Sequence, residues 1–441
     1  MRLSNPGHNA SSEQGCSERY SLQEKIRLTA LPDCAPAQSL EDSGILDVCM
    51  VRARVRFAEI FVQGTLRRES IGISLVAARH QARVQLQSRS GGDSSRRART
   101  RARRVARLSR HRHVGNGVSH RSPEFEAIND RTEQSLRRVL GIPDDYAVLF
   151  LQGGGSLQFA MVPMNLYLPG KPVDVLHTGS WTSKAMEELK KLATYRLAAS
   201  TESAKFTRVP RTNEIALAPG ASYVFMCTNN TIDGTEWNEI PETGAVPLVA
   251  DMSSNICSRP IEVRQFGLIF AGAQKNLGPS GATVVILRRD LAERADEKVA
   301  KILQYRTHMK ERSLYHTPPT FAVYMMGLVL DWIEAEGGLA AIEKRNESKA
   351  KLLYDAIESG GYYHCPIEQG SRSRMNVVFR VAGGDEAIEK KFVKEAEAAG
   401  IVGIKGHRLV GGMRASLYNA VPPEAVEALV SFMRDFERKN G

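Results

Sequence analysis

A lysine among small residues is the first candidate for chemistry in this 441-residue sequence. Lys275 stands in "FAGAQKNLGPSG", where glycine and alanine let the backbone approach a flat ligand closely. A lysine amine can form a Schiff base with an aldehyde when it is partly neutral at the working pH. A lone lysine is usually a surface residue, but this setting favours a lysine that meets a ligand.

A carboxylate precedes this lysine at about the distance between two successive strand ends. Asp251 follows an apolar run in "VADMSSNICSRP", 24 residues before Lys275. The carboxyl ends of strands are where α/β sheets bind ligands. Such a carboxylate could keep a pyridine nitrogen protonated and so make the ring an electron sink. A turn or helix-capping aspartate is an equally good explanation of Asp251 taken alone.

Two further segments complete a constellation. In "LQGGGSLQF", three glycines between a strand and a helix suggest backbone N–H groups that face an anion, although the pattern is neither GxGxxG nor GxxxxGK[ST]. In "HTGSWTS", Trp181 could stack on a planar ligand. A structural turn and a core tryptophan are the better explanations of each segment alone. Together, a glycine turn that can bind a phosphate, a tryptophan that can stack on a ring, a carboxylate that can pair with a pyridinium nitrogen and a lysine that can form a Schiff base predict a pyridoxal phosphate site.

Arginine and histidine residues indicate an anionic substrate. They occur in "SHRS", "SRSRMN" and "KGHRLVGGMRAS", which hold the pairs His120–Arg121 and His407–Arg408. Arginine binds carboxylates and phosphates through two parallel hydrogen bonds. Surface salt bridges are the alternative, favoured for Arg372 and Arg374, whereas the glycines near Arg414 favour a site role. We expect a substrate with several negative charges.

Strands that alternate with helices must position these residues. Apolar runs of strand length cover 146–151, 173–179, 223–229, 246–254, 266–274 and 282–290, with helical patterns over 153–166, 180–192, 317–338 and 340–361. This order predicts an α/β domain with a mostly parallel sheet. Residues 375–441 show a βαβα pattern typical of a smaller α+β domain. We predict a large domain over 114–345 and a small one over 346–441.

The first quarter of the chain has a different composition. The whole chain has a net charge of +11, and residues 1–113 carry 21 basic and 10 acidic residues, so the excess lies there. An arginine-dense stretch without apolar periodicity cannot bury enough surface to fold alone. A basic arm for nucleic acid is one interpretation, and a disordered or mistranslated segment is the other.

Several classes of protein are disfavoured. The six cysteines show no CxxC spacing, which argues against a disulfide framework or a zinc site and favours a reducing compartment. No apolar run approaches the roughly 18 residues that span a membrane, and the start lacks the pattern of a signal peptide. We therefore expect a cytoplasmic enzyme without a metal.

The motifs together resemble one family. "VSHRS", "GSW", "NNTIDGTE", "ADMSSNICSRP", "AGAQKNLGPSG", "HTPPTF" and "KGHRLVGGMRASLYNA" occur in an order similar to that of the phosphoserine aminotransferases, which are class V, fold-type I, pyridoxal-phosphate-dependent enzymes. The resemblance covers Val114 to Gly441. It implies transfer of the amino group of L-glutamate to 3-phosphohydroxypyruvate, and a related step of pyridoxine synthesis.

The resemblance also implies roles for single residues. Lys275 would be the catalytic Schiff-base lysine, Asp251 the partner of the pyridine nitrogen, and Trp181 the stacking ring. Gly155, Ser156 and Gln274 would bind the phosphate of the cofactor, and Thr231 would bind its ring hydroxyl. In a homodimer, His316 and Thr317 would bind the cofactor of the other subunit. Arg414 would bind the α-carboxylate of the substrate, and its phosphate or side-chain carboxylate would be bound by His120, Arg121, His407 and Arg408.

The chain departs from the family at two places. The family usually has Asn at the position of His316, although an imidazole can also donate to a phosphate. A segment like "NFSAGPA" is absent, and the arginine-rich stretch stands in its place. A one-base shift lets "HRHVGNG" (His111–Gly117) be read as "TGMSVME" and "RVQLQ" (Arg83–Gln87) as "VYNFS". We hypothesise that residues 83–117 are an out-of-frame reading, which the nucleotide sequence would test.

Two rival functions stay open at this point. Another class V enzyme, such as an alanine–glyoxylate aminotransferase or a cysteine desulfurase, is disfavoured by the His–Arg pairs, and the desulfurase also by the lack of a mobile-loop cysteine. A nucleic-acid-binding protein built on residues 51–113 would show strongly salt-dependent DNA binding.

Overall fold

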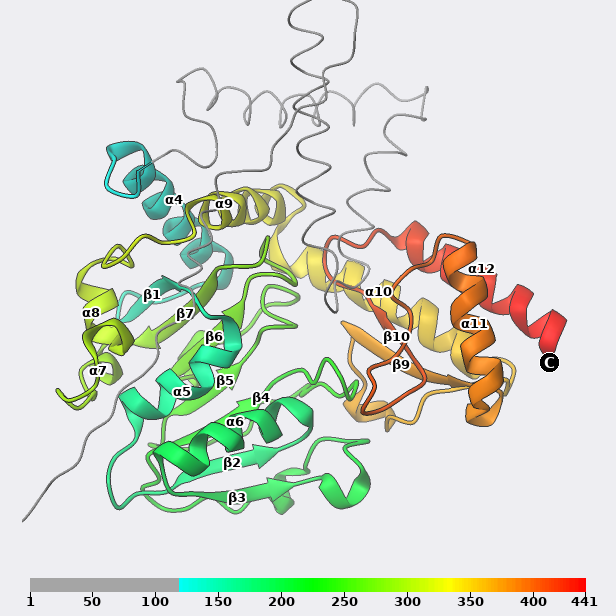
Figure 1. Ribbon diagram of the computed structural model, residues 1–441, viewed down its shortest axis with the longest axis horizontal. Helices are drawn as coiled ribbons and strands as arrows, with labels where there is room; N and C mark the ends of the chain where they lie inside the picture. The colour runs from blue at the N-terminus through cyan, green and yellow to red at the C-terminus, as the bar shows by residue number, and fades with distance from the viewer. Residues whose placement is uncertain (1–118) are drawn as a thin grey trace, which may run out of the picture. The chain divides into compact units, whose positions relative to one another are not determined.

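The computed structural model describes residues 119–441, and a seven-stranded sheet is its central element (Figure 1). Its strands are β1 (Tyr146–Leu151), β2 (Val173–His177), β3 (Tyr195–Ser200), β4 (Tyr223–Cys227), β5 (Leu248–Asp251), β6 (Leu268–Gly272) and β7 (Thr283–Arg288). They lie side by side in the order β1-β7-β6-β5-β4-β2-β3. Each apolar run predicted as a strand contains one of these strands.

The sheet is mostly parallel, as predicted. The pairs β2–β3, β2–β4, β4–β5 and β5–β6 are parallel, whereas β7 is antiparallel to both of its neighbours, β6 and β1. Strand β1 therefore runs in the same direction as β2, β4, β5 and β6. The carboxyl ends of these five strands share one edge of the sheet, where ligands bind in such folds.

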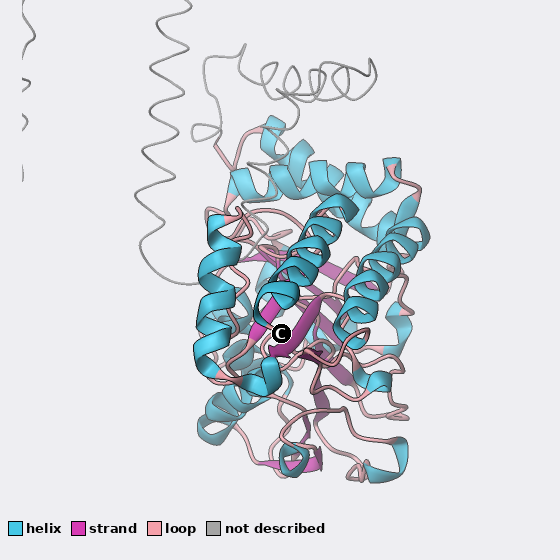
Figure 2. Cartoon of the chain, turned by 90° about the vertical axis from the view of Figure 1, so that its right-hand side faces the viewer, coloured by secondary structure: helices cyan, strands magenta, loops and turns pink. Residues whose placement is uncertain are grey.

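Helices cover both faces of this sheet, because the strand residues point alternately to two apolar cores. On one face, Val148 and Phe150 of β1 belong to a core shared with α4 (Pro123–Leu140) and α9 (Thr320–Ala335). On the other face, Leu149 belongs to a core shared with α5 (Gly154–Leu166), α6 (Ser180–Leu192), α7 (Arg289–Ala292) and α8 (Tyr305–Lys310). Figure 2 shows strands, in magenta, with helices, in cyan, around them.

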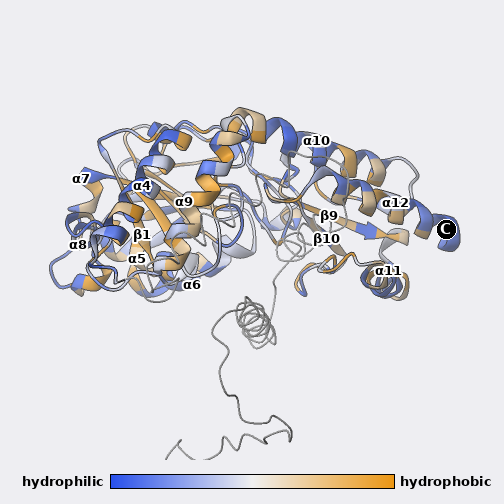
Figure 3. Cartoon of the chain, turned by 90° about the horizontal axis from the view of Figure 1, so that it is seen from above, coloured by the Kyte–Doolittle hydropathy of each residue, from blue (hydrophilic) through white to orange (hydrophobic). Residues whose placement is uncertain are grey.

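A second, three-stranded antiparallel sheet follows. It consists of β8 (Tyr363–His364), β9 (Asn376–Val381) and β10 (Met413–Ser416), with β9 in the middle. Its core is shared with α10 (Gly338–Glu358), α11 (Glu386–Ala398) and α12 (Pro423–Asn440). The three helices turn polar faces outward (Figure 3). This part confirms the prediction of a small α+β unit.

The expectations for the arginine-rich segment 1–113 lie outside the described residues. Within residues 119–441, no helix is long and apolar enough to cross a membrane.

Candidate active site

Six predicted cofactor-site residues and the lysine meet at one cavity. The cavity has a volume of about 140 Å³ and lies at the shared strand edge of the large sheet. Its lining is Gly154, Gly155, Ser156, Phe159, Trp181, Cys227, Asn229, Thr231, Asp251, Ser253, Ser254, Gln274 and Lys275. The loops after β1, β4, β5 and β6 supply most of it, as expected for a sheet of this topology.

Lys275 reaches this cavity from the turn after β6. Its Nζ donates a hydrogen bond to Thr231 Oγ1 at 2.6 Å and lies 5.6 Å from the centre of the Trp181 ring. Thr231 is itself buried, with 7 % of its surface exposed. The amine is thus held in a defined place next to an aromatic face, which is what a Schiff-base lysine needs.

Asp251 ends β5 and is buried. Its Oδ1 accepts from the backbone N–H of Ser253 at 2.9 Å. Burial raises the pKa of Asp251, while the hydrogen bonds of Ser253 and the charge of Lys275 act in the opposite direction. A buried carboxylate in need of a cationic partner fits the predicted pairing with a protonated ring nitrogen.

The start of α5 can hold an anion. The helix begins at Gly154, and Gly153 before it offers no side-chain cap to the first N–H groups. Gly155 in this first turn lies close to the rest of the lining, because a Cβ on it would be 3.6 Å from both Ser253 Oγ and the Phe270 ring. Uncapped N–H groups together with the helix dipole favour a phosphate here.

Trp181 lies in the first turn of α6, and a buried carboxylate fixes that turn. Asp233 accepts from Ser180 N at 2.9 Å and from Ser180 Oγ at 3.1 Å, and burial raises the pKa of Asp233. The Asp233 carboxylate lies close to the backbone of Gly179, where a Cβ would be only 2.4 Å from Asp233 Oδ2. The indole Nε1 is buried and has no hydrogen-bond partner in the described part of the chain.

Part of the predicted substrate set lies beside the cavity. Arg414 Nη1 donates to the backbone oxygen of Thr231 at 3.4 Å, and its Nε is buried without a partner among the described residues. Burial and then the charges of Arg414, Arg408 and Lys184 lower the pKa of His407. Lys184, which the sequence analysis did not single out, lies with its Nζ 4.4 Å from the centre of the Trp181 ring. Arg414 and Lys184 thus contact two residues of the lining, and both lie close enough to His407 to lower its pKa.

Seven predicted residues are not part of the cavity lining. Three of them, His407, Arg408 and Arg414, belong to the substrate set just described, and the other four are His120, Arg121, His316 and Thr317. The backbone oxygen of Thr317 accepts from Gln152 Nε2 at 3.0 Å, just before the glycine loop, and the His316 ring lies 5.9 Å from that of His308. Their predicted contacts, to substrate or to another subunit's cofactor, stay predictions.

Two arginines of "SRSRMN" form ion pairs. Arg372 pairs with Glu358 at 2.6 Å, and Arg374 pairs with Glu347 at 3.3 Å. The salt-bridge interpretation that the sequence favoured for them agrees with this geometry. Arg374 also reaches the buried Glu236 at 3.6 Å.

Sequence reasoning missed several residues of the lining. Phe159, Cys227, Asn229, Ser253 and Ser254 were not predicted. Ser253 and Ser254 follow Asp251 directly, so their place at a strand end was a usable signal. For Phe159, Cys227 and Asn229 no local pattern distinguishes a lining residue from a core residue.

The geometry fits pyridoxal phosphate. The cavity is lined by an uncapped helix start and a buried carboxylate, and a lysine amine in it lies near an indole whose N–H has no partner among the described residues. A larger cavity of about 330 Å³ adjoins Thr228, Asn255 and Arg259, but no lysine lines it. The smaller cavity is therefore the candidate active site.

The comparisons with known proteins agree with this site. The family model "Aminotransferase class-V" matches residues 72–429. A phosphoserine aminotransferase of Geobacillus kaustophilus is 54% identical over 323 residues, which is 73% of this chain and 89% of the relative.

Solved structures agree as well. A phosphoserine aminotransferase from Bacillus circulans subsp. alkalophilus is 47% identical with a TM-score of 0.73, and the match covers 77% of this chain and 96% of that one. A PLP-bound phosphoserine aminotransferase from Trichomonas vaginalis is 40% identical with a TM-score of 0.69, and the match covers 72% of this chain and 90% of that one. An alanine–glyoxylate aminotransferase from Nostoc sp., at 18% identity and a TM-score of 0.56, covers 73% and 89% and shares the fold alone. This chain belongs to the class-V aminotransferase family.

Proposed function

We propose that this protein is a phosphoserine aminotransferase. It transfers the amino group of L-glutamate to 3-phosphohydroxypyruvate and yields O-phospho-L-serine and 2-oxoglutarate, a step of serine biosynthesis. The phosphohydroxythreonine step of pyridoxine biosynthesis is a second use of the same site. The proposal rests mainly on the position of Lys275. Its Nζ lies 2.6 Å from Thr231 Oγ1, in a cavity that Asp251 and the start of α5 also line.

Pyridoxal phosphate, when bound, supplies an aldehyde for the amino group and a ring that accepts electrons from the substrate Cα. Lys275 would hold that aldehyde through its Nζ and, when free, would carry a proton to and from the substrate Cα. Asp251 would keep the ring nitrogen protonated, since its buried carboxylate favours a cationic partner. Trp181 would stack on the ring, and the N–H groups of α5, with Ser156 and Gln274, would hold the phosphate. Each residue thus binds, orients or carries a proton.

The cations beside the cavity suit two acidic substrates in turn. Arg414 binds the α-carboxylate common to both, because its guanidinium is held near Thr231. His407 and Arg408, together with His120 and Arg121, hold the phosphate of one substrate or the side-chain carboxylate of the other. Burial, followed by the charges of Arg414, Arg408 and Lys184, lowers the pKa of His407 and so favours its neutral imidazole, which can still donate one hydrogen bond.

The protein works as a cytoplasmic homodimer in this proposal. His316 and Thr317 would reach the cofactor phosphate of the other subunit, which accounts for their position outside the cavity of their own chain. The large domain would end near residue 345 and the small one begin at 346, within α10. The long helix would then join the two sheets.

An absorbance spectrum tests the proposal. We expect purified chain mixed with pyridoxal phosphate to show the visible band of a lysine Schiff base, and L-glutamate to bleach it. Lys275→Ala should show neither effect. A band that persists in Lys275→Ala, or that glutamate does not affect while another amino donor does, would contradict the assignment.

A further inference from the structure

The loop of residues 228–237, here called the Thr231 loop, makes two contacts toward the site. Thr231 Oγ1 receives the hydrogen bond from Lys275 Nζ, and Asp233 fixes the first turn of α6. The loop is closed on itself, because Trp237 N donates to Thr228 O at 2.9 Å and Asn230 N to Thr235 O at 2.7 Å. Any group that holds the base of this loop therefore sets where the Thr231 hydroxyl meets the lysine.

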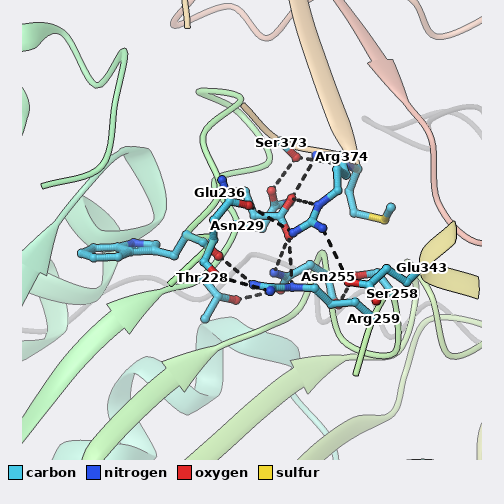
Figure 4. A network of polar contacts seen from close by, with 12 residues as sticks. Thr228, Asn229, Glu236, Asn255, Ser258, Arg259, Glu343, Ser373 and Arg374 are labelled. Carbon is cyan, nitrogen blue, oxygen red and sulfur yellow. Dashed lines mark hydrogen bonds and ion pairs between the residues drawn. The ribbon is translucent and has the colours of Figure 1, made fainter. Parts of the chain in front are cut away.

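Glu236 holds that base (Figure 4). It has 1 % of its surface exposed, and its backbone N–H donates to Ser371 O at 2.9 Å. One carboxylate oxygen accepts from Arg374 N at 2.9 Å and lies 3.6 Å from Arg374 Nε. The other accepts from Asn255 Nδ2 at 3.3 Å and lies 3.9 Å from Arg259 Nε.

The buried carboxylate of Glu236 depends on all of these contacts. A buried carboxylate is tolerated only where cations and hydrogen bonds replace its water, and removal of its charge leaves the partners unpaired. Arg374 has further partners on α10, Glu347 at 3.3 Å and Glu343 at 3.7 Å. Through Arg374, Glu236 thus ties the Thr231 loop to a helix that also packs against the small sheet.

The same network continues to the strand that carries Asp251. Asn255 Oδ1 accepts from Thr228 Oγ1 at 2.7 Å, and Asp251 O accepts from Thr228 N at 3.0 Å. Three hydrogen bonds, through Asn255 and Thr228, connect the Glu236 carboxylate to the backbone of Asp251. Glu236 itself lines neither cavity, so it cannot touch a ligand in the site.

We propose that Glu236 is a positioning residue of the active site, which acts on Lys275 through the hydroxyl of Thr231. The inference rests on the proposed function, since it assigns to that site a residue that determines where its lysine lies. A neutral side chain of the same shape should loosen the base of the loop and weaken the Thr231–Lys275 hydrogen bond without removing any group from the cavity.

A pH titration of the visible cofactor band tests this. We would compare wild type with Glu236→Gln, Thr231→Val, the double variant, and Glu343→Gln as a matched control. Glu343 also pairs with Arg374, at 3.7 Å, but it lies on α10 and not next to the Thr231 loop in sequence. The other titratable or charged groups around Lys275 and Thr231 are the same in all five proteins, and they are Asp251, Cys227, Asp233, Lys184 and Arg414.

We expect Glu236→Gln to shift the titration midpoint in the direction in which Thr231→Val shifts it, and Glu343→Gln to leave it at the wild-type value. The double variant should show only the shift of Thr231→Val, because one effect acts through the other. Additive shifts would mean that Glu236 acts through its charge alone, and no shift would mean a purely structural role. Either result overturns the proposal.

Thermal unfolding of each variant checks that it is folded. If Glu236→Gln does not fold, Glu236→Asp, which keeps the charge but is one methylene shorter, takes its place with the same expectations. A wild-type protein without any visible band would instead contradict the proposed function, so the two failures are distinguishable.

Discussion

The burial of Asp251 serves catalysis at the expense of stability. A carboxyl whose pKa is raised in the folded chain binds a proton more tightly there than in the unfolded chain. Its contribution to stability is therefore lost as pH rises from the unfolded pKa through the folded one, and at neutral pH the bare carboxylate is a cost. Residues of functional sites commonly lower the stability of the fold in this way.

Replacement of Asp251 by Asn should separate the two effects. We expect kcat to fall about 100-fold or more, because the ring nitrogen loses its anionic partner. The cofactor-free variant should melt at a higher temperature than cofactor-free wild type at neutral pH, since no charge is buried. Steady-state rates and scanning calorimetry measure the two quantities. A less stable variant would indicate that Asp251 is held as a well-compensated ion in the empty site.

At the scale of elements, Lys349 of α10 is a buried amine with a structural role. Its Nζ donates to the backbone oxygens of Leu417, Tyr418 and Val421 at 2.9, 2.9 and 3.1 Å. These oxygens follow β10, the strand that carries Arg414. Burial lowers the pKa of Lys349 to about 7. The side chain thus links the helix to the chain that leaves the strand.

Lys349→Met should destabilise the protein in a pH-dependent way. The variant leaves three buried carbonyl groups without a donor, which costs about 2 kcal/mol or more in the free energy of unfolding. Above about pH 7 the unfolded chain holds a proton on this lysine that the folded chain has released, so wild type gains stability as pH rises. The difference between the proteins should grow by about 2 kcal/mol from about pH 7 to about pH 9 in urea unfolding. A constant difference would contradict the lowered pKa.

The loop before β10 depends on a close backbone approach. Gly406 N donates to Gly412 O at 2.8 Å, and a Cβ on Gly406 would lie 2.0 Å from the backbone oxygen of Gly411. Gly406→Ala must therefore displace the loop that carries His407 and Arg408. We expect the KM for the phosphorylated substrate to rise about tenfold or more, with the cofactor band unchanged. Gly370→Ala is the control, because a Cβ there meets no atom within 4 Å. Equal KM values for both variants would exclude the loop from substrate binding.

The sequence indicated those elements whose signal is local. The helix Ser180–Leu192 and the strand Tyr146–Leu151 were predicted with their observed bounds. The edge strand β3 was missed because its residues are only partly buried and carry Arg196, which pairs with Asp174. Helix α4 was not predicted either, although Ser122 caps its start and Gly141 ends it.

The candidate site could be predicted where a residue's type matched its chemistry. Lys275, Asp251 and Trp181 were found in this way, and they line one cavity. Glu236 and Lys184 could not be found, because a charged residue is recognised as part of a site only by its neighbours in space. Glu236 meets Arg374 across 138 residues of chain.

At the scale of the whole molecule, the antiparallel strand β7 was not foreseen. It lets the chain return between β6 and β1 without a crossover helix, and it still leaves β1 pointing toward the shared edge. The glycine loop after β1 and the lysine after β6 can then face one cavity. The hypothesis of an out-of-frame segment over 83–117 falls outside the described residues and stays a prediction for the nucleotide sequence.

A shared active site makes a prediction that only an oligomer can satisfy. If His316 binds the cofactor phosphate of the other subunit, Lys275→Ala removes the site of its own chain, whereas His316→Asp removes the site of its partner by repulsion of the phosphate. Each variant alone should be nearly inactive. A dimer with one subunit of each kind keeps one intact site, built from the wild-type Lys275 of one chain and the wild-type His316 of the other.

The two variants are mixed in equal amounts and allowed to exchange subunits. Half of the dimers should then contain one subunit of each kind, and each of these mixed dimers has one of its two sites intact. The mixture should therefore recover about a quarter of the wild-type activity. Size-exclusion chromatography of the same samples reports whether dimers are present, and unmixed variants at the same total concentration are the control. Dimers that exchange subunits yet recover no activity would place His316 in the site of its own chain. The side chain would then have to move toward the start of α5, away from its present place beside His308.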